Sequence, residues 1–93
     1  MEKLKTLIVD DESLARRGLR LRLASHKDVE IVGECGNGRE ALAAIPDLVP
    51  DLIFLDIQMP GVDGFDVVRG LQGDDMPMVV FVTAYDQFAI KAF

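Results

Sequence analysis

Residues 52–64 read Leu-Ile-Phe-Leu-Asp-Ile-Gln-Met-Pro-Gly-Val-Asp-Gly, and this stretch decides the fold. Its first four residues are all apolar, which predicts a short strand that is buried on both faces and ends at Asp56. The Pro-Gly pair that follows is typical of a turn. Asp63 can then cap a helix over residues 64–71. The stretch therefore predicts a strand, a turn and a helix, with a carboxylate where the strand ends.

The alternation of strand and helix extends outward in both directions. Apolar or alternating runs predict strands over residues 7–9, 30–35 and 78–82. Helical periodicity predicts helices over 13–25 and over 39–45, where Pro46 would stop the second, and a last helix that begins near Asp86. Because strands that alternate with helices form parallel sheets, the expected fold class is α/β, a doubly wound parallel sheet with helices on both faces.

Composition and charge restrict the function. Ten basic and sixteen acidic side chains give a net charge of −6, which argues against nucleic acid as a ligand of these residues, because phosphate neutralisation needs a basic surface. The single cysteine, Cys35, excludes an internal disulfide. The longest apolar stretch, residues 76–84, is less than half a membrane span, and residues 1–5 lack the apolar core of a signal peptide. We therefore expect a cytoplasmic protein without a membrane segment.

Acidic side chains stand at the ends of two predicted central strands: Asp10 and Asp11 at one, Asp56 at the other. Because the carboxyl ends of parallel strands share one edge of a sheet, we expect these carboxylates to converge if the strands are neighbours. Oxygen ligands without histidine or thiolate favour Mg²⁺. Thr83, at the end of the fourth strand, would add a hydroxyl. Such a site could hold a phosphoryl group, with a carboxylate as nucleophile.

Structural roles for the same residues are the alternative. Asp11 or Ser13 could cap the first helix. Asp56 could be a turn residue ahead of the Pro-Gly pair. These interpretations stay open at the level of composition and spacing.

Three motifs carry a resemblance to a known family: Leu7-Ile8-Val9-Asp10-Asp11-Glu12, the Asp-x-x-Met-Pro-Gly-x-Asp-Gly run over residues 56–64, and Val82-Thr83-Ala84. From residue 5 to residue 93 the chain resembles the receiver domain of two-component response regulators. The resemblance implies a flavodoxin-like (CheY-like) sheet with strand order 2-1-3-4-5. Residues 83–93 further resemble the subgroup whose DNA-binding output domain is of the LytTR (LytR/AlgR) type.

The resemblance implies a phosphorylation site. Asp56 matches the phosphoacceptor, to which a sensor histidine kinase would transfer a phosphoryl group. Asp11 matches the direct ligand of Mg²⁺ (or Mn²⁺), and Asp10 matches a neighbour that acts largely through water. Gln58 would offer its backbone carbonyl to the metal, which Asp56 would also contact.

The resemblance also implies a switch. Thr83 matches the hydroxyl that turns toward the phosphoryl group, and Ala84 matches the small residue that leaves it room. Gln58 and Tyr85 match the two variable positions that tune dephosphorylation. The implied protein is a signalling switch that controls transcription and is not an enzyme. The arginines of the first predicted helix would then form either a docking face for the kinase or a solvated face.

The sequence departs from the family pattern after the fourth strand. The family has a fifth strand with a Lys followed by Pro; Lys91 is no substitute, because it falls in the last predicted helix. We therefore expect residues 1–93 to form an incomplete receiver domain that lacks the last strand and helix, with the DNA-binding output domain downstream. The strand over 78–82 would have an unpaired edge, so we expect a dimer or a strand-exchanged oligomer.

Two other functional classes are compatible with an acidic site of this kind. A phosphatase or transferase of the haloacid dehalogenase type also uses an Asp nucleophile and Mg²⁺, but it expects an Asp-x-Asp pattern after the first strand, where this chain has adjacent acids. The second is an interaction module of the receiver fold that is not phosphorylated. Exposure to a small phosphodonor separates the three classes by a stable adduct, by turnover or by no reaction.

Overall fold

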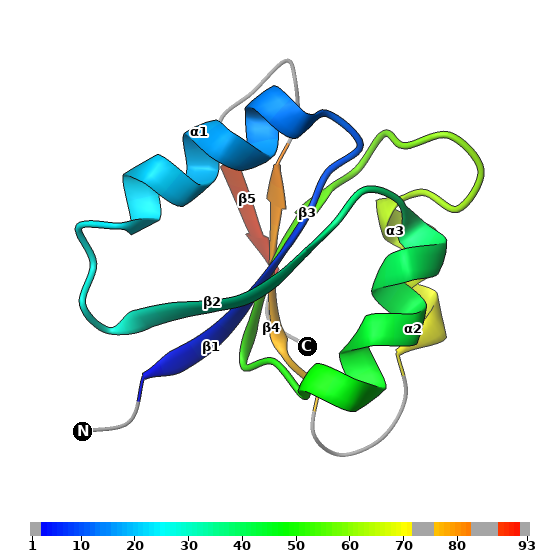
Figure 1. The fold of residues 1–93 in the computed structure, drawn as a ribbon. Helices are drawn as coiled ribbons and strands as arrows, with labels where there is room; N and C mark the ends of the chain where they lie inside the picture. Colours follow the sequence, from blue (N-terminus) through cyan, green and yellow to red (C-terminus); the bar gives the residue numbers. More distant parts are fainter. Residues whose placement is uncertain (1–2, 72–75, 83–87, 92–93) are drawn as a thin grey trace.

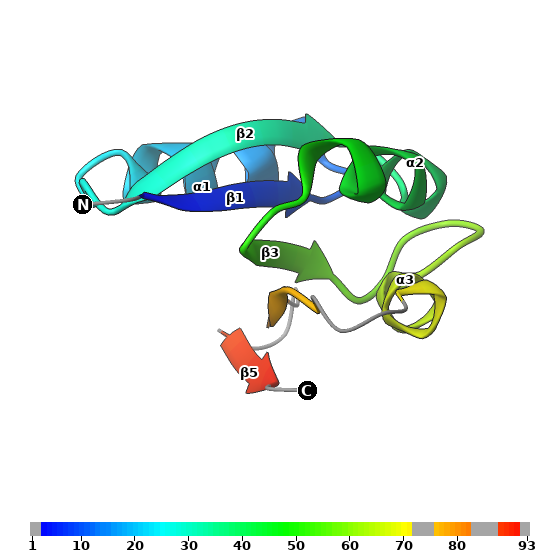
Figure 2. The ribbon, with the colours of Figure 1, turned by 90° about the horizontal axis from the view of Figure 1, so that it is seen from below.

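A computed structural model describes residues 3–71 and 76–82 and the backbone of residues 88–91. Its centre is one sheet whose strands lie in the order β2-β1-β3-β4-β5 (Figures 1 and 2). The strands are β1 (Leu4–Val9), β2 (Val29–Cys35), β3 (Leu52–Asp56), β4 (Met78–Val82) and β5 (Phe88–Lys91). The first four are parallel, which confirms the predicted order 2-1-3-4 and places β2 at an edge.

Helices lie on both faces of this sheet, as a doubly wound α/β fold requires. They are α1 (Ser13–Leu23), α2 (Gly38–Leu48) and α3 (Gly64–Gly70). Figure 1 shows α1 on one side of the sheet and α2 with α3 on the other. None of the described helices is long and apolar enough to cross a membrane.

The hydrophobic core lies between the sheet and the pair α2 and α3. Alternate strand residues point into it because successive side chains of a strand face opposite sides. Its members are Leu7 and Val9 of β1, Cys35 of β2, Ile53 and Leu55 of β3, Val79 and Phe81 of β4, Ala41 and Ile45 of α2, Val67 of α3, and Met59 of the loop after β3. On the opposite face, α1 buries no residue among those described, and a cavity of about 250 Å³ lies between α1 and the strands.

The last predicted helix is wrong. Residues 88–91 form β5, which pairs antiparallel with β4, with Val79 opposite Lys91 and Val82 opposite Phe88. Through this pairing the backbone N–H and C=O groups along β4 gain hydrogen-bond partners. A helix formed by the same residues would leave those groups unpaired. The predicted unpaired edge of β4 is therefore also wrong. Self-association, which that edge led us to expect, stays a prediction.

Pro46 does not stop the second helix. α2 continues to Leu48, and Val49 then ends it in the left-handed conformation, with φ 46° and an N–H that donates to the carbonyl of Ile45 at 2.8 Å. Proline lacks an N–H and removes one bond of the helix. In the last turn a single lost bond is tolerated, because the turn is closed by the Val49 N–H.

Candidate functional site

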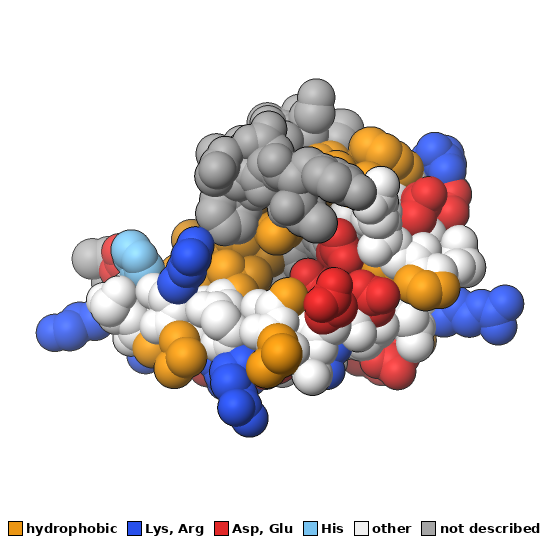
Figure 3. Space-filling model, turned by 90° about the horizontal axis from the view of Figure 1, so that it is seen from above, with side chains coloured by type: hydrophobic (Ala, Val, Ile, Leu, Met, Phe, Trp, Pro, Cys, Tyr) orange, Lys and Arg blue, Asp and Glu red, His pale blue; other side chains and the backbone are white. Residues whose placement is uncertain are grey.

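The site lies where β1 and β3 end. These strands are parallel neighbours with Val9 opposite Leu55, so the residues that follow emerge side by side. One carboxylate oxygen each from Asp10, Asp11 and Asp56 lies within 4.8 Å of the others. Figure 3 shows acidic side chains gathered on this edge of the molecule. The structure thus brings together the three carboxylates that the spacing predicted would converge.

Backbone N–H groups orient two of the three carboxylates. The Glu12 N–H donates to Asp10 Oδ1 at 2.9 Å, and the Gln58 N–H donates to Asp56 Oδ1 at 3.3 Å. The N-cap of α1 is Glu12, and its side chain makes no capping hydrogen bond within the described part of the chain. Capping of α1 by Asp11 or Ser13, the structural alternative, is therefore not what the structure shows.

Burial and mutual repulsion disfavour the ionised form of Asp56. Burial is the largest cause that raises the pKa of Asp56, to about 7, and the negative charge of Asp10 is the next. The Gln58 N–H opposes this rise, and Asp11 adds to it. Burial also raises the pKa of Asp10, against the lowering effect of the Glu12 N–H. Because like charges this close repel each other, binding of a proton or a cation to these carboxylates is favoured.

The loop after β3 is shaped by a glycine and a helix cap. A Cβ on Gly64 would lie 2.5 Å from the carbonyl oxygen of Asp56, so α3 can begin against the Asp56 backbone only because residue 64 has no side chain. Asp63 caps α3 as predicted, with its carboxylate accepting from the Asp66 N–H at 2.9 Å in a capping box. Gly61 has φ +79°, which fits the predicted turn. These features hold the end of β3 in place.

The donor set fits a hard divalent cation. All three side chains offer carboxylate oxygens, and such oxygens suit Mg²⁺ or Mn²⁺. The fourth predicted ligand, the backbone carbonyl of Gln58, belongs to a residue in the same loop, two positions after Asp56. An open hollow of about 470 Å³ adjoins Asp11, lined by the loops before α2 and α3.

Thr83, Ala84 and Tyr85, the predicted switch and tuning residues, lie outside the described residues. The sequence does not predict a place beside the site for Arg16, whose guanidinium donates to the backbone carbonyl of Asp10 at 2.6 Å. Sequence leaves open whether the arginines of α1 are a docking face or a solvated face. In the structure Arg16 and Arg20 pair with Glu34 of β2, and the docking face stays a prediction. The only signal of this pairing in the sequence is Glu34, an acidic residue near the end of the strand predicted over residues 30–35.

Comparisons with known proteins agree with this geometry. The sequence pattern of the family described as "Response regulator receiver domain" matches residues 6–93. The transcriptional regulatory protein BtsR of Salmonella typhi is 53% identical over 90 residues, which are 97% of this chain and 38% of that protein. An uncharacterized response regulatory protein of Shewanella oneidensis is 51% identical over 87 residues, 94% of this chain and 37% of that protein. The chain thus spans well under half the length of these relatives.

Solved structures show the same fold. The response regulator domain of Thermotoga maritima CheB superposes with a TM-score of 0.82 at 29% identity, over 89% of this chain and 62% of that one. The response regulatory domain of protein mrkE from Klebsiella pneumoniae gives a TM-score of 0.80 at 36% identity, over 87% of this chain and 67% of that one.

Proposed function

This chain belongs to the response regulator receiver domain family, and we propose that its Asp56 accepts a phosphoryl group from a sensor histidine kinase. The observation that supports this most directly is the convergence of three carboxylates within 4.8 Å at the ends of neighbouring parallel strands. Asp56 is half-buried there, at the end of β3, and the open hollow adjoins Asp11. Proteins of this family act as the switch in two-component signalling, and we assign this chain that role.

In the proposed reaction Asp56 is the nucleophile. One oxygen of its ionised carboxylate forms a P–O bond with the phosphoryl group while the N–P bond to the kinase histidine breaks, and the histidine nitrogen keeps the electron pair. Because the pKa of Asp56 is about 7, Asp56 is protonated in a large fraction of the molecules near neutral pH. Any cation held beside Asp56 therefore favours the reactive form.

We assign metal binding to the side chains of Asp10, Asp11 and Asp56 and to the backbone carbonyl of Gln58. Bound Mg²⁺ or Mn²⁺ would neutralise charge on the carboxylates and on the phosphoryl oxygens. The Gln58 N–H orients one oxygen of Asp56, and the Glu12 N–H orients one oxygen of Asp10.

Apart from Gln58, the residues and domains of the proposed switch and output lie outside the described part of the chain. We assign the switch hydroxyl to Thr83, the small residue beside it to Ala84, and control of dephosphorylation to Gln58 and Tyr85. We further propose that phosphorylation controls transcription through a LytTR-type DNA-binding domain elsewhere in the protein. The relatives that are named transcriptional regulatory proteins support this output. A cytoplasmic location follows from the proposed partner and output.

Incubation with acetyl phosphate and Mg²⁺, followed by intact mass measurement, tests the assignment. The expected result is a single phosphoryl adduct that is absent in Asp56→Asn and in samples with excess chelator. Asp47→Asn is the matched control, because Asp47 is an exposed aspartate on α2. Continuous release of phosphate without an adduct would instead indicate an enzyme. Absence of both would indicate an interaction module that is not phosphorylated.

A further inference from the structure

Arg16 connects the acidic site to the end of β2. Its Nη1 donates to the carbonyl oxygen of Asp10 at 2.6 Å, and its Nε lies 3.3 Å from Oε1 of Glu34. Only 22% of the Arg16 side chain and 28% of the Glu34 side chain is exposed. The guanidinium therefore bridges a backbone carbonyl and a carboxylate in a partly shielded position, where such contacts are stronger than on an open surface.

Glu34 is itself held in place from a second direction. The Nε and Nη2 of Arg20 both reach Oε2 of Glu34 at 2.6 Å, so each carboxylate oxygen has an arginine partner. Glu34 directly precedes Cys35, whose carbonyl accepts the N–H of Asp10 at 3.1 Å. Both backbone polar groups of Asp10 are thus bonded to partners that β2 fixes, one directly and one through Arg16.

These polar contacts matter because α1 is poorly anchored by apolar packing. The helix contributes no buried residue among those described, and a cavity separates it from part of the sheet. The loop between β1 and α1 carries Asp10 and Asp11. Its conformation near the site therefore depends on hydrogen bonds more than on the core.

We propose that Arg16, held by Glu34, is a positioning residue that fixes the Asp10 backbone, and with it the Asp10 carboxylate, in the arrangement that binds a divalent cation. The inference rests on the metal site of the proposed function. Arg16 does not touch the metal or the phosphoryl group. It acts through the backbone of Asp10.

The direction in which metal affinity changes when Arg16 is removed distinguishes a positioning role from a purely electrostatic effect of its charge. A guanidinium near a cation site repels the cation, so its removal tightens metal binding if charge alone matters. If Arg16 positions Asp10, its removal weakens binding, because the ligand loses its preferred orientation. Residues that orient metal ligands in this way change metal affinity by about 10- to 100-fold.

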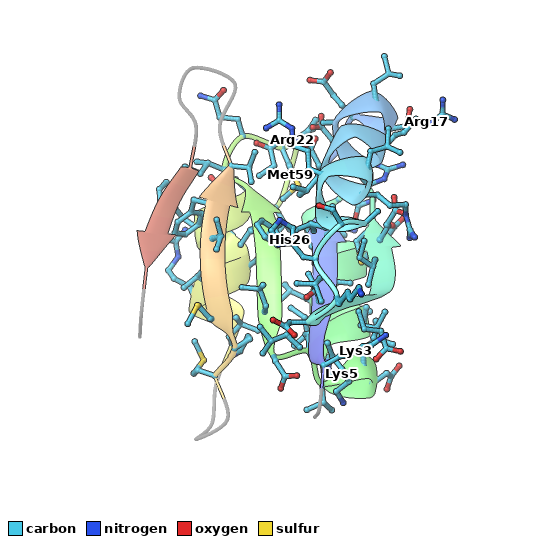
Figure 4. All side chains as sticks on the ribbon, turned by 90° about the vertical axis from the view of Figure 1, so that its left-hand side faces the viewer. Lys3, Lys5, Arg17, Arg22, His26 and Met59 are labelled. Carbon is cyan, nitrogen blue, oxygen red and sulfur yellow. The ribbon has the colours of Figure 1, made fainter. Side chains whose placement is uncertain are left out.

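The test measures the Kd of Mg²⁺ from the rise of melting temperature with Mg²⁺ concentration, with isothermal titration as a second method. The variants of the 93-residue chain are Arg16→Met, Arg16→Lys and Arg17→Met. Arg17 is the matched control, since it is exposed on the same helix and points away from the strands (Figure 4). We expect Arg16→Met to weaken Mg²⁺ binding about tenfold and Arg17→Met to leave it unchanged or slightly tighter.

Arg16→Lys keeps the charge but replaces a planar fork by a single ammonium, which cannot hold both partners in the same geometry. Weaker Mg²⁺ binding by this variant therefore supports positioning, and it decides the matter if Arg16→Met does not fold. Wild-type affinity in Arg16→Lys, or unchanged or tighter binding by folded Arg16→Met, overturns the positioning role. A wild-type chain that does not bind Mg²⁺ contradicts the proposed metal site itself, which is a different failure.

Discussion

The carboxylate of Asp10 lies beside that of Asp56, and after burial its negative charge is the largest cause that raises the pKa of Asp56 to about 7. The proximity follows from the register of two parallel strands, in which Val9 of β1 is opposite Leu55 of β3. The same proximity that makes a cation site is a source of instability when no cation is bound. The stability of the chain should therefore report on the site.

Stability without metal should fall as pH rises through the pKa of Asp56. The unfolded chain releases this proton near the ordinary aspartate value of 3.8, while the folded chain keeps it up to about 7. The stabilising contribution of the protonated group is therefore complete below the unfolded pKa and is lost between these two values. Asp56→Asn, which is always neutral, should remove this part of the pH dependence.

Urea unfolding with chelator at about pH 5 and about pH 8 measures the effect. Asp56→Asn should raise the midpoint more at the higher pH than at the lower pH, because less of the contribution of the protonated group is lost at the lower pH. Asp47→Asn is the control for loss of an exposed carboxylate. Equal pH dependence in wild type and Asp56→Asn would show that Asp56 titrates normally in the folded chain.

Added Mg²⁺ or Mn²⁺ should stabilise the chain, because the ion relieves the repulsion among the three carboxylates. At a concentration 100-fold above Kd the gain is about 2.7 kcal/mol. Asp11→Asn should abolish most of this gain, and Asp47→Asn should keep it. The measurement is the melting temperature with and without millimolar Mg²⁺ at fixed ionic strength. A melting temperature that does not move would count against a formed site.

The cap of α3 should contribute to stability and that of α1 should not. Asp63→Ala removes the carboxylate that accepts the Asp66 N–H and should cost about 1 kcal/mol. Glu12→Ala removes an N-cap side chain without a capping bond and should change stability by no more than a few tenths of that. The urea midpoints of the two variants make the comparison. Similar losses would mean that the capping box of α3 is not formed in solution.

Two glycine-to-alanine changes should have opposite signs. Gly18 lies within α1, and a Cβ added there would meet no atom within 4 Å, so Gly18→Ala should stabilise the chain by about 0.5–1 kcal/mol through helix propensity. Gly64→Ala places a methyl group against the Asp56 carbonyl and should destabilise the chain and weaken Mg²⁺ binding. Chemical unfolding and Mg²⁺ titration of both variants test this. A neutral Gly64→Ala would show that α3 can shift without disturbing Asp56.

Much of the fold could be predicted from local patterns. Apolar runs such as residues 52–55 mark central strands, because both faces of such a strand must be covered by helices. A Pro-Gly pair followed by Asp63 marks a turn and a helix start. Parallel strands place Asp10, Asp11 and Asp56 on one edge, so the convergence of the carboxylates also follows from sequence.

Tertiary structure decided the remainder. Residues 88–91 have a helical pattern in isolation, yet they pair with β4, because backbone groups at a strand edge need partners that no local pattern reveals. Spacing alone could not show that Arg16 lies against the Asp10 carbonyl or that Glu34 holds Arg16, since these residues come from a helix and a strand that are separate in sequence. The raised pKa of Asp56 is likewise a property of the folded chain. Burial and two neighbouring carboxylates act on Asp56 only after the strands have assembled.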